Sequence, residues 1–430
     1  MSVTRVDEHA CVRSATGAQC GISRPSVLHV VTPSWAVPFL RGQLHYLTHR
    51  GFDVLVSSAP GHELQAVTHE EGIRAIPIPI AREISPWKDL IAFVHLFILV
   101  RRVRPTITNV STPKAGLLGG LAAWLNGVPC RVYTLRGLRC ETARGVKLRI
   151  LWVSERITCW CAHRVICVSE SLREAAIKAG VVNRERTTVI GSGSSNGVEE
   201  SRFMPTKERQ RKAVQIRREF NIPADAPVVG FAGRLTRDKG ISELYEAHRL
   251  LRNEFPALRL MLVGDYEEGD KLPLATRQSI EDDPSVIRTG VVSNSSDFYH
   301  VFNVVAFPSH REGFPNTILE AHASGKPVVA TRATGTVDAI VDGVSGFLVP
   351  VGNAKALAEK LAKLLGNPTL AEEMGTAGRA RVVREYQPES IWKALTEEYV
   401  ELLRVNALPL PISEIPPWEL APFERDAASS

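Results

Sequence analysis

The chain has 430 residues, of which 44% are hydrophobic and 23% charged, a composition typical of globular proteins rather than of disordered or fibrous ones. This length predicts two domains of about 200 residues each, because one ordinary core rarely holds more than ~250–300 residues. The net charge is uneven: residues 1–200 hold 24 Lys/Arg against 15 Asp/Glu, whereas residues 201–430 hold 28 against 31. Such an asymmetry indicates an anionic partner for the first half (nucleic acid, anionic lipid or a phosphorylated substrate), unless the surplus arginines are simply solvated.

The cysteines and the N-terminus indicate a cytoplasmic protein. All seven cysteines lie in the first half, without the spacing of a disulfide framework, so we expect reduced thiols. Cys159 and Cys161 are separated by one residue, not by the two of usual zinc or redox pairs. No basic region precedes an apolar run at the N-terminus, and the most lipid-like segment, residues 90–100, has only eleven residues. We expect no signal peptide and no transmembrane helix.

A first domain is predicted at residues 25–200, after a disordered tail at residues 1–24. Short β-rich runs alternate there with segments of helical periodicity such as residues 39–51 and 115–127. Strands separated by helices of this length predict right-handed crossovers and a mostly parallel sheet. The predicted strands cover residues 26–32, 53–59, 74–80, 106–112, 130–136, 164–169 and 186–191.

The alternation stops at residues 191–220, which are rich in Gly and Ser and then strongly basic. Their glycines miss the spacing of a dinucleotide-binding loop, so we interpret the segment as a flexible crossover to a second domain at residues 201–387. The second set of predicted strands covers residues 228–235, 259–264, 285–290, 304–309, 327–332 and 346–350. Residues 388–405 are expected to form a helix that can pack back on the first domain, and residues 406–430 a Pro-rich tail.

The predicted fold class is therefore α/β, with two Rossmann-like, doubly wound parallel sheets that face a central cleft. In such sheets the ligand binds beyond the carboxyl ends of the strands, so the loops that follow strands are the first place to look for chemistry.

One of these loops, after the predicted strand 304–309, leads into a predicted helix at residues 315–324. Pro315 suits a first helical turn, and the free amides of residues 316–318 would form an anion site suited to phosphate. Glu312 can point at the group attached to that phosphate, and Glu320 can reach the hydroxyls of a ribose. Taken alone, the two glutamates would more often be a capping acid and a surface residue.

A second loop, GRLTRDKG at residues 233–240, brings Arg234 and Lys239 to the corresponding place after another strand. Two cations beside a helix N-terminus match a diphosphate, because they neutralise charge that grows as a phosphate leaving group departs. A solvated basic turn is the alternative. The sequence contains no G-x-x-x-x-G-K-[ST] motif, which excludes the usual triphosphate hydrolases.

These motifs, together with REGFPNTILEAHASGKPVVAT (residues 311–331) and GVSGFLVP (residues 343–350), resemble the donor domain of retaining glycosyltransferases of family four, which have the GT-B architecture. The resemblance covers residues 27–404. Residues 111–145 and 190–203 are similar to a bacterial branch that builds O-antigen, capsule and exopolysaccharide units on undecaprenyl diphosphate, usually from UDP-sugars.

The resemblance implies a role for each matching residue. Arg234 and Lys239 would hold the donor diphosphate, Glu312 would contact the transferred sugar, and Glu320 would bind the ribose. The main chain of four residues would complete the phosphate site: Gly313, Phe314, Asn316 and Thr317. The resemblance also implies a lipid diphosphate-linked acceptor, no nucleic-acid partner and transfer with retention of configuration. Glu312 is not expected to act as a covalent nucleophile, because the sugar and its diphosphate would fill that space.

The first half departs from the family pattern in two loops. Where many members carry a histidine facing the donor sugar, this chain has Arg136 followed by Gly137, and an arginine cannot serve as a neutral base. After the first strand, family members often have a glycine pair, whereas this chain has only Gly42. We expect the acceptor side to be formed by four cations: Arg41, Lys114, Arg136 and Arg139. No D-x-D carboxylate pair occurs, so we expect no essential metal and no cofactor besides the nucleotide sugar.

Residues 86–105 have an apolar centre flanked by basic residues and a tryptophan. Such a helix suits the inner leaflet of the plasma membrane, with its cations on anionic lipid, although burial against the sheet explains its apolar residues equally well. The resemblance favours a cytoplasmic protein attached peripherally to that surface. Two alternatives to a transferase remain: a UDP-sugar epimerase of similar build, and a non-catalytic homologue that serves in assembly.

Overall fold

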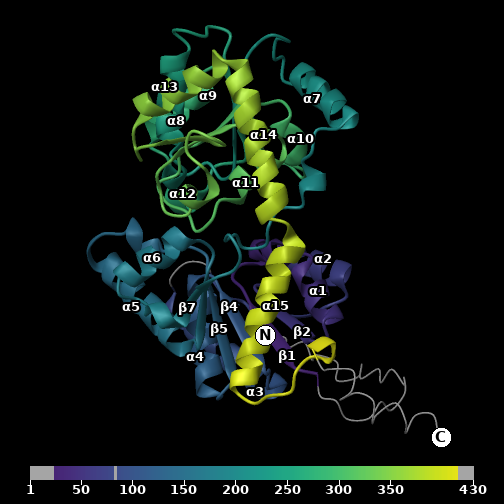
Figure 1. Cartoon of the computed structure of the whole chain (residues 1–430). Helices are drawn as coiled ribbons and strands as arrows, with labels where there is room; N and C mark the ends of the chain where they lie inside the picture. The colour runs from purple at the N-terminus through teal and green to yellow at the C-terminus, as the bar shows by residue number, and fades with distance from the viewer. Residues whose placement is uncertain (1–23, 82–84, 415–430) are drawn as a thin grey trace, which may run out of the picture.

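The computed structural model describes residues 24–81 and 85–414 and contains two α/β domains (Figure 1). The strands are β1 (Ser26–Val30), β2 (Asp53–Ser58), β3 (Arg74–Pro77), β4 (Ile107–Ser111), β5 (Cys130–Leu135), β6 (Arg164–Cys167), β7 (Thr187–Val189), β8 (Val228–Ala232), β9 (Arg259–Val263), β10 (Val286–Gly290), β11 (Val304–Phe307), β12 (Val328–Thr331) and β13 (Gly346–Val349). Every strand that the sequence predicts is confirmed, with ends one to three residues shorter.

The helices of the N-terminal domain are α1 (Gln43–His49), α2 (His62–Glu71), α3 (Pro86–Val103), α4 (Pro113–Leu125), α5 (Gly145–Cys161) and α6 (Glu170–Lys178). Those that follow are α7 (Lys207–Glu219), α8 (Ile241–Leu251), α9 (Leu274–Asp282), α10 (Ser296–Tyr299), α11 (Asn316–Ala323), α12 (Thr336–Ala339), α13 (Ala354–Leu365), α14 (Pro368–Glu385) and α15 (Pro388–Val405). Three short 3₁₀ helices lie in loops that follow strands: η1 (Ser34–Leu40), η2 (Arg139–Glu141) and η5 (Arg237–Lys239).

Both sheets are parallel and doubly wound. The N-terminal sheet has seven strands in the order β3-β2-β1-β4-β5-β6-β7, and the C-terminal sheet has six in the order β10-β9-β8-β11-β12-β13. The direction of winding therefore reverses between β1 and β4 and again between β8 and β11. These two reversals are the switch points at which ligands bind in open α/β sheets.

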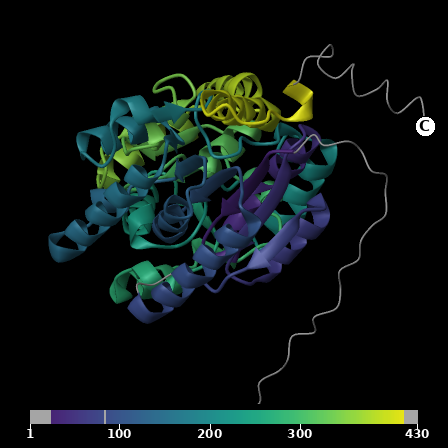
Figure 2. The same cartoon turned by 90° about the horizontal axis from the view of Figure 1, so that it is seen from below.

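Two apolar layers cover the N-terminal sheet. Leu28, Val30 and Leu55 point into the same core as buried residues of α3, α4 and α5. Val27 and Val31 point to the opposite face, where Leu44 of α1 and Tyr399 of α15 are fully buried. The last helix of the chain therefore completes the core of the first domain. Figure 1 shows α14 in the upper domain and α15 running down the lower one, and in Figure 2, seen from below, the yellow C-terminal helices lie at one side of the purple strands.

The segment between the domains differs from the expected flexible crossover. Residues 207–219 form helix α7, capped by the Thr206 side chain, which accepts a hydrogen bond from the backbone of Arg209. Nearer the first domain, the Ser194 amide donates to the carbonyl of Val168 over 2.7 Å, and the Val198 amide donates to that of Tyr386 over 2.9 Å. The crossover is therefore hydrogen-bonded to both neighbouring units.

The predicted tails are only partly described. The N-terminal tail lies outside the described residues except for Arg24, and so does the C-terminal tail beyond residue 414. Before that point the chain is not simply extended, because Leu408 and Leu410 pack against the N-terminal core and the Ser413 hydroxyl donates to the carbonyl of Arg50 over 2.8 Å.

Candidate active site

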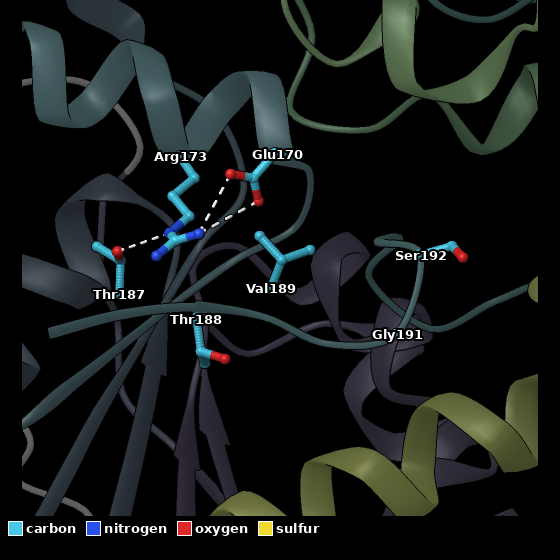
Figure 3. Close-up of a pocket in the computed structure, with 7 residues that line it drawn as sticks. All are labelled: Glu170, Arg173, Thr187, Thr188, Val189, Gly191 and Ser192. Atoms are coloured by element: carbon cyan, nitrogen blue, oxygen red, sulfur yellow. Dashed lines mark hydrogen bonds and ion pairs between the residues drawn. The ribbon is translucent and has the colours of Figure 1, made fainter. Parts of the chain in front are cut away.

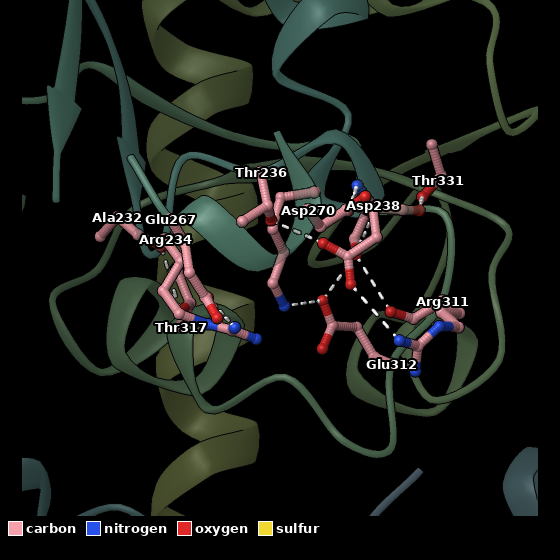
Figure 4. Close-up of polar contacts among 12 residues, drawn as sticks. Ala232, Arg234, Thr236, Asp238, Glu267, Asp270, Arg311, Glu312, Thr317 and Thr331 are labelled. Carbon is pink, nitrogen blue, oxygen red and sulfur yellow. Dashed lines mark hydrogen bonds and ion pairs between the residues drawn. The ribbon is translucent and has the colours of Figure 1, made fainter. Parts of the chain in front are cut away.

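The loops after β8 and β11 meet at the switch point of the C-terminal sheet (Figure 4). Gly240 ends η5 with a left-handed φ of +70°, and a Cβ atom there would lie 2.1 Å from the carbonyl oxygen of Pro308, so only glycine allows this approach. The amide of His310 donates to the carbonyl of Asp238 over 2.7 Å. The backbone thus holds the two loops side by side.

Lys239 and Glu312 form an ion pair across these loops. Their side chains are only 14% and 13% exposed, and the Ser309 hydroxyl donates to the same carboxylate oxygen, Glu312 Oε1, over 2.6 Å. Two residues that lie far apart in the sequence, and that were predicted to serve one ligand, are therefore in direct contact. Ser309, the last residue of the predicted strand, was not recognised as part of this group.

Arg234 lies on the other side of the same loop and pairs with Glu267, which follows β9. Its guanidinium carbon is also 5.9 Å from the ring centroid of Trp35, a residue of η1 in the N-terminal domain. The side chain of Arg234 is 46% exposed, so water screens both contacts. No sequence motif points to Glu267, and Trp35 stands out only because it lies in the first-strand loop that departs from the family pattern.

The helix that follows Glu312 begins at Asn316, one residue later than predicted, with Pro315 as its N-cap. No side chain caps it and no acid occupies its first turn, so the positive end of its dipole has no protein anion of its own. The prediction of three free amides is wrong for Ile318, whose amide donates to the Pro315 carbonyl over 3.1 Å. The amides of Asn316 and Thr317 stay as predicted ligands of a phosphate.

Glu320 lies inside this helix and is held by Tyr299 of α10, whose hydroxyl donates to Glu320 Oε2 over 2.7 Å. Burial raises the pKa of Glu320, and the hydrogen bond from Tyr299 opposes that rise. The tyrosine holds one carboxylate oxygen, Oε2, and the binding of a ribose by Glu320 stays a prediction. Tyr299 could not be identified from the sequence, because its partner is twenty-one positions away.

The loop between β11 and α11, residues 308–315, also touches the N-terminal domain; we call it the donor loop after its predicted ligand. Gly313 packs so closely that a Cβ atom would lie 2.0 Å from the carbonyl oxygen of Arg136, and its own carbonyl accepts a hydrogen bond of 2.7 Å from the Ser169 hydroxyl. The ring of Phe314 is buried and lies 5.4 Å from that of Tyr386. The loops that follow strands of both sheets are therefore in contact, with the carboxyl ends of the sheets facing each other.

Further hydrogen bonds join the two domains around this contact. Arg311 Nε donates to the Thr142 hydroxyl over 3.0 Å, and the Thr334 hydroxyl donates to Glu141 Oε1 over 2.6 Å. All of these groups lie in loops or short helices after strands, so the arrangement depends on how the two domains are turned toward each other.

The four cations expected on the acceptor side have different surroundings. Arg41 Nη2 is 3.2 Å from Glu70 Oε2 at an exposed position, and Lys114, in the first turn of α4, is 2.7 Å from Asp89 Oδ1 of α3. Arg139 is exposed in η2. Arg136, which follows β5, has its backbone carbonyl directly against the donor loop.

The sequence predicts no essential metal, and the side chains that could bind one are the His, Cys, Asp and Glu residues. Within residues 24–81 and 85–414, no three or more His, Cys, Asp or Glu side chains cluster in a way that suits a metal ion. The cysteines of that part of the chain are buried free thiols, and burial raises the pKa of Cys167 to about 12.

A pocket of about 330 Å³ lies at the edge strand β7 (Figure 3). Arg173 is part of its lining, and hydrogen-bonds to the Thr187 hydroxyl over 2.9 Å and to Glu170 over 3.2 Å. Because these groups already satisfy one another, we assign the pocket no chemistry.

The segment predicted to face either the membrane or the sheet forms α3, which is buried on one face and exposed on the other. Ala92, Leu96, Leu99 and Val100 of α3 are buried, whereas five apolar residues of the same helix are exposed: Trp87, Leu90, Ile91, Val94 and Ile98. Helix α5 also exposes Val146, Leu148, Ile150 and Val153. A search of the described residues finds no helix with the length and apolarity that a membrane span requires.

Comparison with known proteins agrees with this architecture. A glycosyl transferase 4-like domain matches residues 36–193, and the domain of glycosyl transferases group 1 matches residues 213–381. The chain is 35% identical over 378 residues to the capsular polysaccharide biosynthesis glycosyltransferase CapM of Staphylococcus aureus. The aligned region covers 88% of this chain and 97% of that relative.

Two further proteins are similar. The UDP-Gal:alpha-D-GlcNAc-diphosphoundecaprenol alpha-1,3-galactosyltransferase of Escherichia coli is 26% identical over 306 residues, 70% of this chain and 77% of that protein. The crystal structure of Anabaena Alr3699/HepE in complex with UDP matches with a TM-score of 0.72 at 20% identity, over 87% of this chain and 100% of that one. Together with the two facing parallel sheets, this likeness confirms the GT-B fold. The chain therefore belongs to the group 1 glycosyltransferases with a 4-like N-terminal domain, and is a transferase enzyme of that family.

Proposed function

We propose that the enzyme moves a hexose or N-acetylhexosamine, with retention of configuration, from a UDP-sugar to a saccharide linked to undecaprenyl diphosphate in bacterial surface polysaccharide synthesis. The observation that carries the donor half of this proposal is the Lys239–Glu312 pair beside the uncapped N-terminus of α11. The relatives support the rest: one is named for capsule synthesis, one for a UDP-sugar donor and a diphosphoundecaprenol acceptor, and one binds UDP.

The donor would lie along the loops after β8 and β11. Its diphosphate would take hydrogen bonds from Lys239, Arg234 and the amides of Asn316 and Thr317, and these cations would neutralise the charge that develops as the diphosphate leaves. Glu312 would contact the transferred sugar, and Glu320 Oε1 the ribose. Because both cations already have a carboxylate partner, donor binding would exchange protein ion pairs for phosphate contacts rather than bury free charges.

In the reaction, the bond between the anomeric carbon and the diphosphate oxygen breaks, and the acceptor oxygen bonds to that carbon on the same face. The proton of the acceptor hydroxyl passes to the departing diphosphate. Without donor, Glu312 Oε1 accepts hydrogen bonds from both Lys239 and Ser309. When Lys239 turns to the diphosphate, Ser309 would still hold that oxygen, so Glu312 is better suited to stabilise an oxocarbenium-like ion pair than to form a covalent bond. No divalent metal is required, since protein cations supply the neutralising charge.

The acceptor would approach from the N-terminal domain. The excess of positive charge in residues 1–200 and the cations Arg41, Lys114, Arg136 and Arg139 favour an acceptor that carries a diphosphate. The exposed apolar residues of α3 and α5 would rest on the lipid surface that holds the acceptor, with Lys88, Arg101, Lys147 and Arg149, all exposed, near the headgroups. This arrangement describes a peripheral enzyme on the inner face of the plasma membrane.

The experiment is incubation of the protein with a panel of UDP-sugars and a diphosphate-linked saccharide, followed by UDP assay, mass spectrometry and NMR of the product. We expect UDP release that depends on the acceptor and a product with the donor's anomeric configuration. Lys239→Ala should abolish release, and Lys355→Ala, which removes an exposed lysine of α13, should not. Interconversion of UDP-sugars without acceptor would instead identify an epimerase, and inversion of the anomeric centre would refute the retaining mechanism.

A further inference from the structure

A small polar cavity lies at the switch point of the N-terminal sheet. It has a volume of about 20 Å³, and its polar lining includes His29 of β1, Asn109 and Ser111 of β4, Thr134 of β5, and Arg136. His29 and Asn109 are directly opposed across the β1/β4 pairing, as Ser111 and Thr134 are across β4/β5. The cavity is therefore at the end of the sheet where such folds bind ligands.

Two polar groups in this cavity lack partners. His29 is 1% exposed, and neither its Nε2 atom nor Nη1 of Arg136 has a hydrogen-bond partner in the described part of the chain. Leaving buried polar groups unpaired costs about 1–3 kcal/mol each, and more for charged groups. The guanidinium of Arg136 lies 5.8 Å from the ring centroid of Phe39, and burial lowers the pKa of Arg136 to about 10. Because buried polar groups nearly always have a hydrogen-bond partner, we expect a polar ligand or a water molecule to bind both groups.

The electrostatics keep the imidazole neutral. Burial, and secondarily the charge of Arg136, lower the pKa of His29 to about 3. At neutral pH the cavity thus offers a cationic N–H donor from Arg136 beside an uncharged imidazole, whose Nε2 atom can accept a hydrogen bond in one tautomer.

The cavity wall is held in place by a buried network. The Thr134 hydroxyl donates to Asn109 Oδ1 over 2.9 Å, and Asn109 Nδ2 donates to the Tyr399 hydroxyl over 2.6 Å. Tyr399 belongs to α15 and is fully buried. The C-terminal helix therefore fixes the walls of the cavity, and the asparagine amide is already engaged at both ends.

The same cavity adjoins the donor loop. Arg136 lines the cavity with its side chain and contacts Gly313 with its carbonyl group. Gly313 follows Glu312, the residue assigned to the transferred sugar. The cavity is therefore on the N-terminal side of the place where the donor sugar and the accepting group meet.

We propose that His29 and Arg136 form a subsite for a single hydroxyl group of a saccharide substrate, in which Arg136 donates to the hydroxyl oxygen and His29 accepts its hydrogen. This inference rests on the proposed transferase function. A volume of about 20 Å³ admits one water-sized group, for which ~10–15 Å³ suffices, and excludes a phosphate. A hydroxyl is the saccharide group of that size that both donates and accepts. The hydroxyl belongs either to the transferred sugar or to the acceptor, and binding experiments distinguish the two.

The test compares wild type with His29→Leu, which removes the ring nitrogens, and His29→Gln, whose terminal amide can replace Nε2. Calorimetry measures binding of UDP, of a UDP-sugar and of a soluble diphosphate-linked saccharide. If the hydroxyl belongs to the donor, His29→Leu weakens UDP-sugar binding about tenfold and leaves UDP binding unchanged; if it belongs to the acceptor, only saccharide binding weakens. His29→Gln restores part of the loss in either case.

Ser57→Ala is the matched control, because it removes the unpartnered side-chain oxygen of another fully buried residue of the same sheet, outside the cavity. Equal affinities of wild type and His29→Leu for all three ligands would overturn the subsite and leave an internal water as its occupant. So would an equal loss in the folded His29→Leu and Ser57→Ala proteins. Because these measurements need no turnover, a wild type that binds ligands but releases no UDP would refute the transferase proposal without deciding against the subsite.

Discussion

Lys239 and Glu312 neutralise each other in a largely buried position, and Arg234 and Glu267 do so at a more exposed one. The electrostatic interaction therefore differs in strength between the two pairs. Water screens the charge of Arg234, whereas Lys239 and Glu312 lie where water screens charges less. This difference predicts different kinetic consequences for the two groups.

Glu312→Gln should lower kcat about 100-fold with a smaller change in the donor KM, because the amide cannot stabilise positive charge that develops on the sugar.

Arg234→Ala should raise the donor KM about tenfold, since it removes a charge-assisted hydrogen bond to the bound diphosphate. Steady-state kinetics with varied UDP-sugar measure both. Arg237→Ala is the control, because that arginine belongs to the same loop but is 73% exposed and lies 3.6 Å from Asp270. Wild-type kinetics in Glu312→Gln would contradict its role.

Glu155 offers a second residue-scale prediction, on stability. It is buried in α5, its Oε1 accepts a hydrogen bond of 2.6 Å from Tyr133, and burial raises its pKa to about 7 from an ordinary value of 4.5. A raised carboxyl pKa means that the folded state holds the proton more tightly, so its contribution is present below pH 4.5 and is lost as the pH rises through 7. The neutral Gln of Glu155→Gln does not titrate.

The stability of Glu155→Gln relative to wild type should therefore increase by about 3 kcal/mol between pH 4.5 and pH 8.5. Urea unfolding at the two pH values measures this difference, and other titrating groups cancel in the comparison. Parallel stability profiles for the two proteins would show that Glu155 titrates alike in the folded and unfolded states.

At the scale of elements, the contact between the donor loop and the β5 loop depends on one glycine. Gly313→Ala would place a Cβ atom 2.0 Å from the Arg136 carbonyl, so the loops must separate. We expect turnover to fall at least tenfold while UDP binding, which we propose to use the C-terminal loops, changes little. Gly120→Ala in α4 is the control, because its nearest neighbour, Cys161 Cβ, would be an ordinary 3.6 Å away. Unchanged turnover would mean that this contact is not needed for catalysis.

The elements themselves were largely predictable. Buried parallel strands consist of runs of Val, Ile and Leu between polar loops, and each such run became a strand. Helix α7 was missed because its residues are so polar and basic that only Ala213 and Ile216 are buried. The burial of one face of α3 against α4, with the other face left exposed, could not be decided from its composition.

At the scale of the whole molecule, the exposed apolar residues of α3 and α5 predict binding to membranes. Trp87 is 78% exposed, and Ile91 is one turn further along the same helix. The double variant Trp87→Ser/Ile91→Ser should bind vesicles of phosphatidylglycerol and phosphatidylcholine several-fold more weakly than wild type in a flotation assay.

Wild-type binding should also weaken when the ionic strength rises, since the basic residues contribute through screened charges. Val291→Ser is the matched control, because Val291 is 84% exposed on the C-terminal domain. Equal flotation of the double variant and wild type, or no binding to anionic vesicles, would rule out α3 as the membrane-facing element.

Sequence patterns alone predict the two parallel sheets and the loops after their strands. They also single out four candidate residues: Arg234, Lys239, Glu312 and Glu320. Local patterns suffice for these features, because strand periodicity and loop motifs are encoded by neighbouring residues. The partners of these residues are known only from the folded chain: Glu267 and Trp35 for Arg234, Tyr299 for Glu320, and His29 beside Arg136 in one cavity. Such contacts depend on strand order and on how the domains face each other, which no local pattern records.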